Sequence, residues 1–175
     1  MKRRDFFKRV SIAGMGVAAA STSLPAIAQV SSAPTADVAG IYELQAAFHR
    51  AKTAQDIELM MSLWDPNGKL AVQGNPNSPF TGTAQLRGYW TNSGSFKNRR
   101  FSLVPSFKTR IEVTGDHAKL YFECHDVGDY DTAQRSIVND TYLTGTVTKI
   151  GDKWVFSDMV AGPSTPLSFD HYYGS

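Results

Sequence analysis

The chain has 175 residues, of which 18 are basic and 16 acidic, giving a formal net charge of +2. The first 28 residues hold five basic side chains and one acidic one, so the remaining 147 carry a net charge of −2. That balance excludes the basic surface of a nucleic-acid-binding protein. Cys124 is the only cysteine, which excludes an intramolecular disulfide. We find no spacing typical of a metal site or a phosphate loop, and we expect no metal, no cofactor and no nucleic-acid partner.

The N-terminus has the pattern of a bacterial export signal. Arg3 and Arg4 precede an uncharged run of small and apolar residues, and Ala26-Ile27-Ala28 offers a small-x-small cleavage site. A general secretory signal or a membrane anchor is the alternative, but an anchor needs about 20 apolar residues and Ser21 to Pro25 interrupts the run. We expect a twin-arginine signal peptide at 1–28, the twin-arginine export machinery as a partner, no stable membrane anchor, and a periplasmic or secreted protein. A linker at 29–36 follows.

Helical patterns come next along the chain. An apolar face spaced for a helix runs from Asp37 to about Ala51. The segment Thr53 to Asp56 has a capping-box pattern for a second helix, whose apolar residues continue to Trp64 and which Asp65-Pro66 should end. A short strand is expected at 69–73, and a third helix from near Thr83 to Gly94.

From residue 100 onward apolar and polar residues alternate, which predicts strands at about 100–114, 117–127, 136–150 and 153–162. Gly115-Asp116 and Gly151-Asp152 have the chemistry of two-residue hairpin turns. The middle connection, 128–135, is a longer loop.

The two tight turns fix a register that can be tested. The first pairs Thr114 with His117 and would place Phe107 opposite Cys124. The second pairs Ile150 with Lys153 and would place Gly145 opposite Asp158. On the opposite face Lys108 should meet Glu123, and Glu112 should meet Lys119. If the middle hairpin pairs Phe122 with Leu143, His125 meets Asp140 on that same outer face.

Three local sequences resemble one known family: Leu63-Trp64-Asp65, Gly82 to Trp90 with Leu86 and Tyr89, and Gly151 to Phe156. With the order of the elements, they make residues 37–162 similar to the SnoaL-like branch of the nuclear transport factor 2-like fold. The resemblance implies an α+β, cone-shaped fold of three N-terminal helices packed on a curved antiparallel β-sheet. It also implies a pocket between helices and sheet, and a homodimer. Residues 163–175 form a C-terminal tail.

Asp158 is the first candidate for catalysis. The predicted register turns it inward among apolar residues beside Gly145, where a carboxylate suits general acid or base work, and family cyclases and isomerases have acidic groups on this face. The alternative is a structural carboxylate at the rim. Tyr42 is the counterpart that the resemblance suggests for the helix tyrosine of ketosteroid isomerases, although the rest of that constellation is not recognisable. His49 could act as a base, but a structural histidine is favoured.

The predicted ligand pocket combines aromatic and polar side chains, which are Trp64, Trp90, Phe122, Phe156, Asp126 and Asn139. The aromatic residues could equally be plain core, and Asp126 with Asn139 could equally close the neighbouring loop. The members of the family include isomerases, polyketide cyclases, dehydratases and epoxide hydrolases. We therefore expect a pocket for a small, largely apolar ligand, with cofactor-independent isomerisation, cyclisation or dehydration. A non-catalytic ligand-binding or dimeric interaction module is the alternative.

Overall fold

The computed structural model describes residues 35–98, 100–129 and 136–164, all within the compact unit formed by residues 32–175. The predicted signal peptide lies outside the described residues, as do the linker up to residue 34, most of the loop 128–135 and the tail beyond Ser164. The helices are α1 (Thr35–Ala54), α2 (Ile57–Ser62), α3 (Gly82–Asn92) and α4 (Gly94–Lys97).

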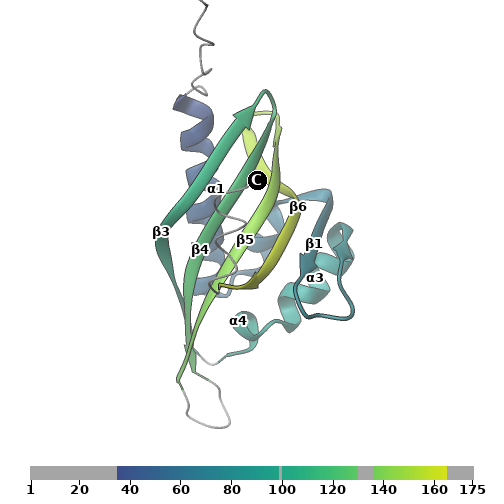
Figure 1. Cartoon of the computed structure of the whole chain (residues 1–175). Helices are drawn as coiled ribbons and strands as arrows, with labels where there is room; N and C mark the ends of the chain where they lie inside the picture. The colour runs from purple at the N-terminus through teal and green to yellow at the C-terminus, as the bar shows by residue number, and fades with distance from the viewer. Residues whose placement is uncertain (1–34, 99, 130–135, 165–175) are drawn as a thin grey trace, which may run out of the picture. The chain divides into compact units, whose positions relative to one another are not determined.

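Six strands form one sheet, which is curved and not closed into a barrel (Figure 1). They are β1 (Trp64–Val72), β2 (Phe80–Thr81), β3 (Arg100–Thr114), β4 (His117–Asp129), β5 (Ser136–Ile150) and β6 (Lys153–Pro163). Their order is β2-β1-β6-β5-β4-β3, and every pair is antiparallel except β1 with β6. The predicted α+β fold is confirmed, and the parallel pair makes the sheet mixed.

The junction between α1 and α2 differs from the prediction. Gln55 takes a positive φ of 55°, and the amides of Gln55 and Asp56 close the end of α1 by donating to the carbonyls of Lys52 and Ala51 (3.2 and 2.9 Å). Asp56 then caps α2 by accepting from the amide of Leu59 at 2.9 Å. The predicted cap at Thr53 is therefore wrong by three residues.

Trp64 was also misplaced by the helical spacing. The helix α2 ends at Ser62, so Trp64 opens β1 instead of closing a helix, and Asp65-Pro66 lies inside that strand. The predicted short strand at 69–73 is the second half of β1.

The registers set by the turns are confirmed near each turn. Thr114 pairs with His117, Ile150 pairs with Lys153, and Glu112 pairs with Lys119. The middle hairpin also has the predicted pairing, with His125 opposite Asp140 and their side chains 2.5 Å apart. Lys108 Nζ lies 2.9 Å from the Glu123 carboxylate, as predicted for the outer face.

Two irregularities shift the register farther from the turns. In β3 the pairing jumps between Pro105 and Thr109, so Pro105, and not Phe107, lies opposite Cys124. Proline cannot donate a ladder hydrogen bond, which suits it to such a bulge.

In β6 the pairing jumps at Ser157, so Gly145 meets Met159 while Asp158 meets Thr146. Ser157 is the extra residue, and its hydroxyl donates to the carbonyl of Thr146 at 2.8 Å. The predicted inward position of Asp158 is wrong, because one inserted residue moves every later side chain to the other face.

The core lies between the inner face of the sheet and the helices. Phe48 of α1 is at its centre, with ring centroids 5.7 Å from Trp90, 5.5 Å from Phe122 and 5.7 Å from Phe156. This aromatic cluster joins α1, α3, β4 and β6, and it holds the end of α1 against the sheet.

Candidate functional site

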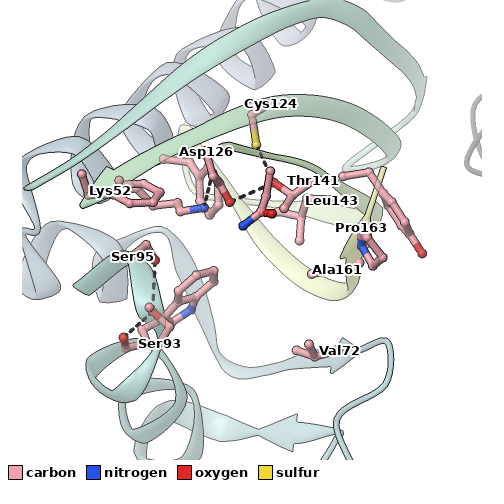
Figure 2. A pocket seen from close by; sticks show the side chains of 18 of the residues that line it. Lys52, Val72, Ser93, Ser95, Cys124, Asp126, Thr141, Leu143, Ala161 and Pro163 are labelled. Carbon is pink, nitrogen blue, oxygen red and sulfur yellow. Dashed lines mark hydrogen bonds and ion pairs between the residues drawn. The ribbon is translucent and has the colours of Figure 1, made fainter. Parts of the chain in front are cut away.

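A cavity of about 290 Å³ lies beyond the aromatic cluster. On one side are β4, β5 and the end of β6, and on the other are the end of α3 and the segment through α4 (Figure 2). Its walls mix aromatic, hydroxyl and amide side chains, and the described part of the chain contributes only two charged residues to them, Lys52 and Asp126.

Lys52 and Asp126 form a buried ion pair in this cavity. Lys52 Nζ lies 3.0 Å from Asp126 Oδ1, and the two side chains are 8% and 16% exposed. Figure 2 shows the two side chains pointing toward each other, Lys52 from the last turn of α1 and Asp126 from β4. The ammonium also lies over the rings of Phe48 and Phe101, 5.5 and 5.1 Å from their centroids. A carboxylate and two aromatic faces thus replace the water that a lysine normally needs.

Hydrogen bonds extend the pair along the sheet. The Thr141 hydroxyl donates to Asp126 Oδ2 at 3.3 Å, and Cys124 Sγ lies 3.2 Å from the Thr141 oxygen (Figure 2). Because the Thr141 proton is used on Asp126, the Cys124 thiol is the donor in the second bond. Burial raises the pKa of Cys124, which keeps it a thiol at neutral pH.

Tyr89 of α3 supplies a neutral hydroxyl to the same cavity. Burial raises the pKa of its phenol, and the negative charge of Asp126 raises it further. The phenol therefore stays protonated within electrostatic reach of the Asp126 carboxylate and can act as a hydrogen-bond donor or a weak acid.

His49 lies beside the pair but does not line the cavity. Burial lowers its pKa from 6.5 to about 4, and the positive charge of Lys52 lowers it further. Its ring packs against Phe48 and Phe122, and it is neutral at pH 7. The position matches the favoured interpretation of a structural histidine.

The structure brings together three of the predicted pocket residues. Trp90, Asp126 and Asn139 line the cavity, and Asp126 and Asn139 lie opposite each other on β4 and β5. Trp64, Phe122 and Phe156 are 5%, 0% and 0% exposed and belong to the filled core, as the alternative interpretation had it.

Asp158 and Tyr42 lie elsewhere. The Asp158 side chain is 59% exposed and pairs with Lys69 at 3.5 Å on the opposite side of the sheet. Tyr42 is 50% exposed and borders a separate surface groove between α1 and β3. The predicted inward position of Asp158 is therefore wrong, and Tyr42, the suggested counterpart of a catalytic tyrosine, does not line the cavity.

Lys52 was missed by sequence reasoning, although a signal was present. It lies four residues after Phe48 and eight after Leu44, on the buried stripe of α1. A lysine on the apolar stripe of a helix needs a buried partner, so this spacing marks it as unusual. Its partner is 74 residues away and cannot be identified from helix spacing.

Among the described residues, no cluster of three or more histidine, cysteine, aspartate or glutamate side chains could hold a metal ion. No helix in the described ranges is long and apolar enough to cross a membrane.

Solved structures with the same fold include several from bacteria. A Streptomyces avermitilis protein of the nuclear transport factor 2-like family, provisionally described as a dehydratase, is 17% identical, with a TM-score of 0.66 over 75% of this chain and 99% of its own. A hexachlorocyclohexane dehydrochlorinase from Novosphingobium barchaimii is 17% identical, with a TM-score of 0.64 over 74% of this chain and 88% of its own.

A ketosteroid isomerase-like protein from Erwinia carotovora atroseptica is 13% identical, with a TM-score of 0.61 over 74% of this chain and 98% of its own. At these identities the likeness shows the fold alone. No curated protein matches the chain. The sequence profile of the SnoaL-like domain, however, matches residues 33–160. The chain therefore belongs to the SnoaL-like domain family.

Proposed function

We propose that this domain binds a small, largely apolar ligand in the cavity and transfers a proton on it without a cofactor. The observation that carries the proposal is the buried Lys52–Asp126 pair at the cavity wall. A buried ion pair is weak evidence for stability, since apolar residues of similar size often stabilise a protein as well. A pair that faces a cavity can in addition donate a hydrogen bond to a ligand and take a proton from it.

The substrate class we propose is a carbonyl compound with an acidic C–H next to the carbonyl group. Lysine has three N–H donors and Asp126 takes one, so another can donate to the carbonyl oxygen. The Asp126 carboxylate takes the adjacent carbon-bound proton, and the ammonium stabilises the enolate oxygen that forms. Tyr89, which lines the same cavity, is the group that we propose to protonate a leaving group or a second carbon. Isomerisation and elimination both begin with this step.

Two solved neighbours support the removal of a proton from carbon, without deciding the substrate class. One solved neighbour is named a dehydrochlorinase and another is named ketosteroid isomerase-like. Loss of HCl and isomerisation of a ketosteroid each require the removal of a proton from carbon. The alternative is a non-catalytic binding module, which is favoured by the fact that Lys52 and Asp126 already satisfy each other.

The exchange of carbon-bound hydrogen for deuterium in a ketone distinguishes the catalytic function from the binding function. With 2-tetralone as the probe in D2O, we expect the protein to accelerate deuterium uptake at the carbons beside the carbonyl. Lys52→Met and Asp126→Asn should each slow it about 100-fold or more, the usual scale of a lost acid–base group. The matched controls are Lys69→Met and Asp158→Asn, which break an exposed pair outside the cavity and should leave the rate within about twofold.

Each outcome of that assay has a meaning. Binding of 2-tetralone without exchange makes the domain a binding module. Equal exchange rates in the wild type and the two cavity variants, with folding verified by thermal unfolding, exclude Lys52 and Asp126 as the catalytic pair. Mass spectrometry of the protein purified under native conditions should in addition reveal a co-purifying ligand.

Export is a separate proposal. The first 28 residues direct the protein through the twin-arginine pathway to the periplasm or the medium, with no stable membrane anchor and no nucleic-acid partner. Arg3 and Arg4 support it. Replacing both with lysine should leave the precursor in the cytoplasm, as cell fractionation with an antibody would show. Normal export of that variant would contradict the twin-arginine route.

A homodimer through the outer face of the sheet is the third proposal. Val127 and Val138 lie opposite each other on that face and are 37% and 69% exposed, next to the His125–Asp140 pair. Exposed apolar residues beside a polar pair suit a partner surface. Sedimentation should give a dimer, and Val138→Asp should give a monomer. A monomeric wild type at high concentration would contradict it.

A further inference from the structure

A second hollow adjoins the cavity on its outer side. It lies between α3 and the turn-rich segment that joins β1 to β2. We call it the amide groove, because its polar side chains are mainly the amides of Asn75, Asn77, Gln85 and Asn92. Among the residues that the structure describes, no charged side chain lines it. In this it differs from the cavity, where Lys52 and Asp126 carry charge.

Three of these side-chain amides each make one hydrogen bond to the backbone, and the other polar group of each amide can bind a ligand. Asn75 Oδ1 accepts from the amide of Asn77 at 3.0 Å, and Gln85 Oε1 accepts from the amide of Thr81 at 2.8 Å. Their NH2 groups remain as donors. Asn92 instead donates its NH2 to the carbonyl of Gly88 at 2.8 Å, and its oxygen remains as an acceptor. The groove thus offers donors and an acceptor whose directions the backbone fixes.

An aromatic pair completes the groove. The rings of Phe80 and Tyr89 have centroids 4.7 Å apart, and both residues are partly exposed at the groove. A hydroxylated ring has C–H faces that pack on aromatic rings and O–H groups that both donate and accept. Neutral amides match those hydroxyls without the desolvation cost of a charge.

The groove and the cavity adjoin each other. Val72, Tyr89, Ser93 and Gly94 line both. Tyr89 contacts residues of both spaces. Its ring packs against Phe80 in the groove, and the charge of Asp126 in the cavity raises the pKa of its hydroxyl. One elongated molecule can therefore occupy both spaces at once.

We infer that the amide groove binds a neutral, polyhydroxylated ring, such as the sugar of a glycoside, attached to the apolar part of the ligand that lies in the cavity. The inference rests on the proposed function for the location of the apolar part. It narrows the ligand class from small apolar molecules to amphipathic ones with an uncharged, hydrogen-bonding end.

Nitrogen-15 NMR of the labelled protein can test the groove and the cavity separately. The side-chain amides of Asn75 and Gln85 report on the groove, and the indole N–H of Trp90 reports on the cavity. Three probes are compared: phenyl β-D-glucopyranoside, anisole, which lacks the sugar, and phenyl β-D-glucuronide, which carries a carboxylate. We expect the glucoside to shift both sets of signals and to bind at least about fivefold more tightly than anisole or the glucuronide.

Variants assign that preference to the groove. Gln85→Glu and Asn75→Asp keep the oxygen that accepts the backbone bond, and they replace the free NH2 donor with a second oxygen that carries negative charge. Each should reduce glucoside binding about fivefold and leave anisole unchanged. Asn67→Asp adds the same charge outside the groove and serves as the matched control.

The outcomes distinguish this inference from the proposed function. If the glucoside shifts only Trp90, or binds no better than anisole, the groove is not a site for hydroxylated rings. If it shifts only the groove amides, the groove site stands and the ligand proposal for the cavity fails. If it shifts neither, the inference is overturned, and the exchange assay still decides the cavity.

Discussion

Gly145 lies opposite Met159, next to the β6 bulge that places Asp158 outside, and replacing it with alanine should strongly destabilise the fold. Its φ of +146° is rarely adopted by residues with a side chain, which costs on the order of 1–3 kcal/mol. An added Cβ would also lie 2.1 Å from the Asp158 carbonyl oxygen and 2.8 Å from Met159 Cα. Both are backbone atoms, so the β5–β6 ladder must separate, at a further cost of about 1–3 kcal/mol. We expect Gly145→Ala to lower the free energy of unfolding by about 3–5 kcal/mol.

Urea unfolding followed by tryptophan fluorescence measures this loss. Gly88→Ala is the matched control, because Gly88 lies in α3 and a Cβ there meets nothing within 4 Å. Alanine should stabilise that helix by about 0.5–1 kcal/mol. The same substitution is thus expected to have opposite signs at the two sites. A loss below about 1 kcal/mol for Gly145→Ala would refute the close backbone approach.

Three further predictions concern single side chains. His49 has a pKa of about 4 in the folded protein against 6.5 ordinarily, so stability should be full above pH 6.5 and fall toward pH 4. The partly exposed ring limits the loss to about 1–2 kcal/mol, and His49→Gln should abolish this part of the pH dependence of unfolding. Lys52→Met leaves the Asp126 carboxylate without its partner and should cost about 3 kcal/mol in thermal unfolding, most of which Lys52→Met/Asp126→Asn should restore. Asp56→Ala removes the cap of α2 and should cost about 1 kcal/mol in urea unfolding, whereas a change below 0.3 kcal/mol would contradict the capping role.

The hairpins were predictable because their turns carry local chemistry. Gly115 and Gly151 take positive φ angles, as glycines in two-residue hairpin turns can, and the strands on either side were predicted with nearly the observed bounds. Register follows from a turn only as far as the pairing is regular. It was right at Glu112 with Lys119 and wrong beyond the bulge at Pro105.

The bulge in β6 had a weak signal in the sequence. Trp154 and Phe156 both point inward and are two residues apart. The next large apolar residue that is buried is Met159, three residues after Phe156. A spacing of two and then three indicates an inserted residue, whereas strict alternation selected Asp158. Either Met159 or Asp158 can face inward, but not both. Met159 is 0% exposed, because burying its apolar side chain is favourable, and Asp158 therefore lies on the outer face.

The displacement of Asp158 and the burial of Lys52 together determine the charge of the cavity. With Asp158 outside, the described residues of the cavity walls carry one ammonium and one carboxylate, which are bonded to each other. An anionic ligand would have to compete with Asp126 for Lys52, and a cationic one with Lys52 for Asp126. A neutral ligand can accept a hydrogen bond from a remaining N–H of Lys52 and donate one to the Asp126 carboxylate, so the ion pair stays intact. The amide groove beside the cavity extends the same preference, so a neutral ligand is the class that we propose for both spaces.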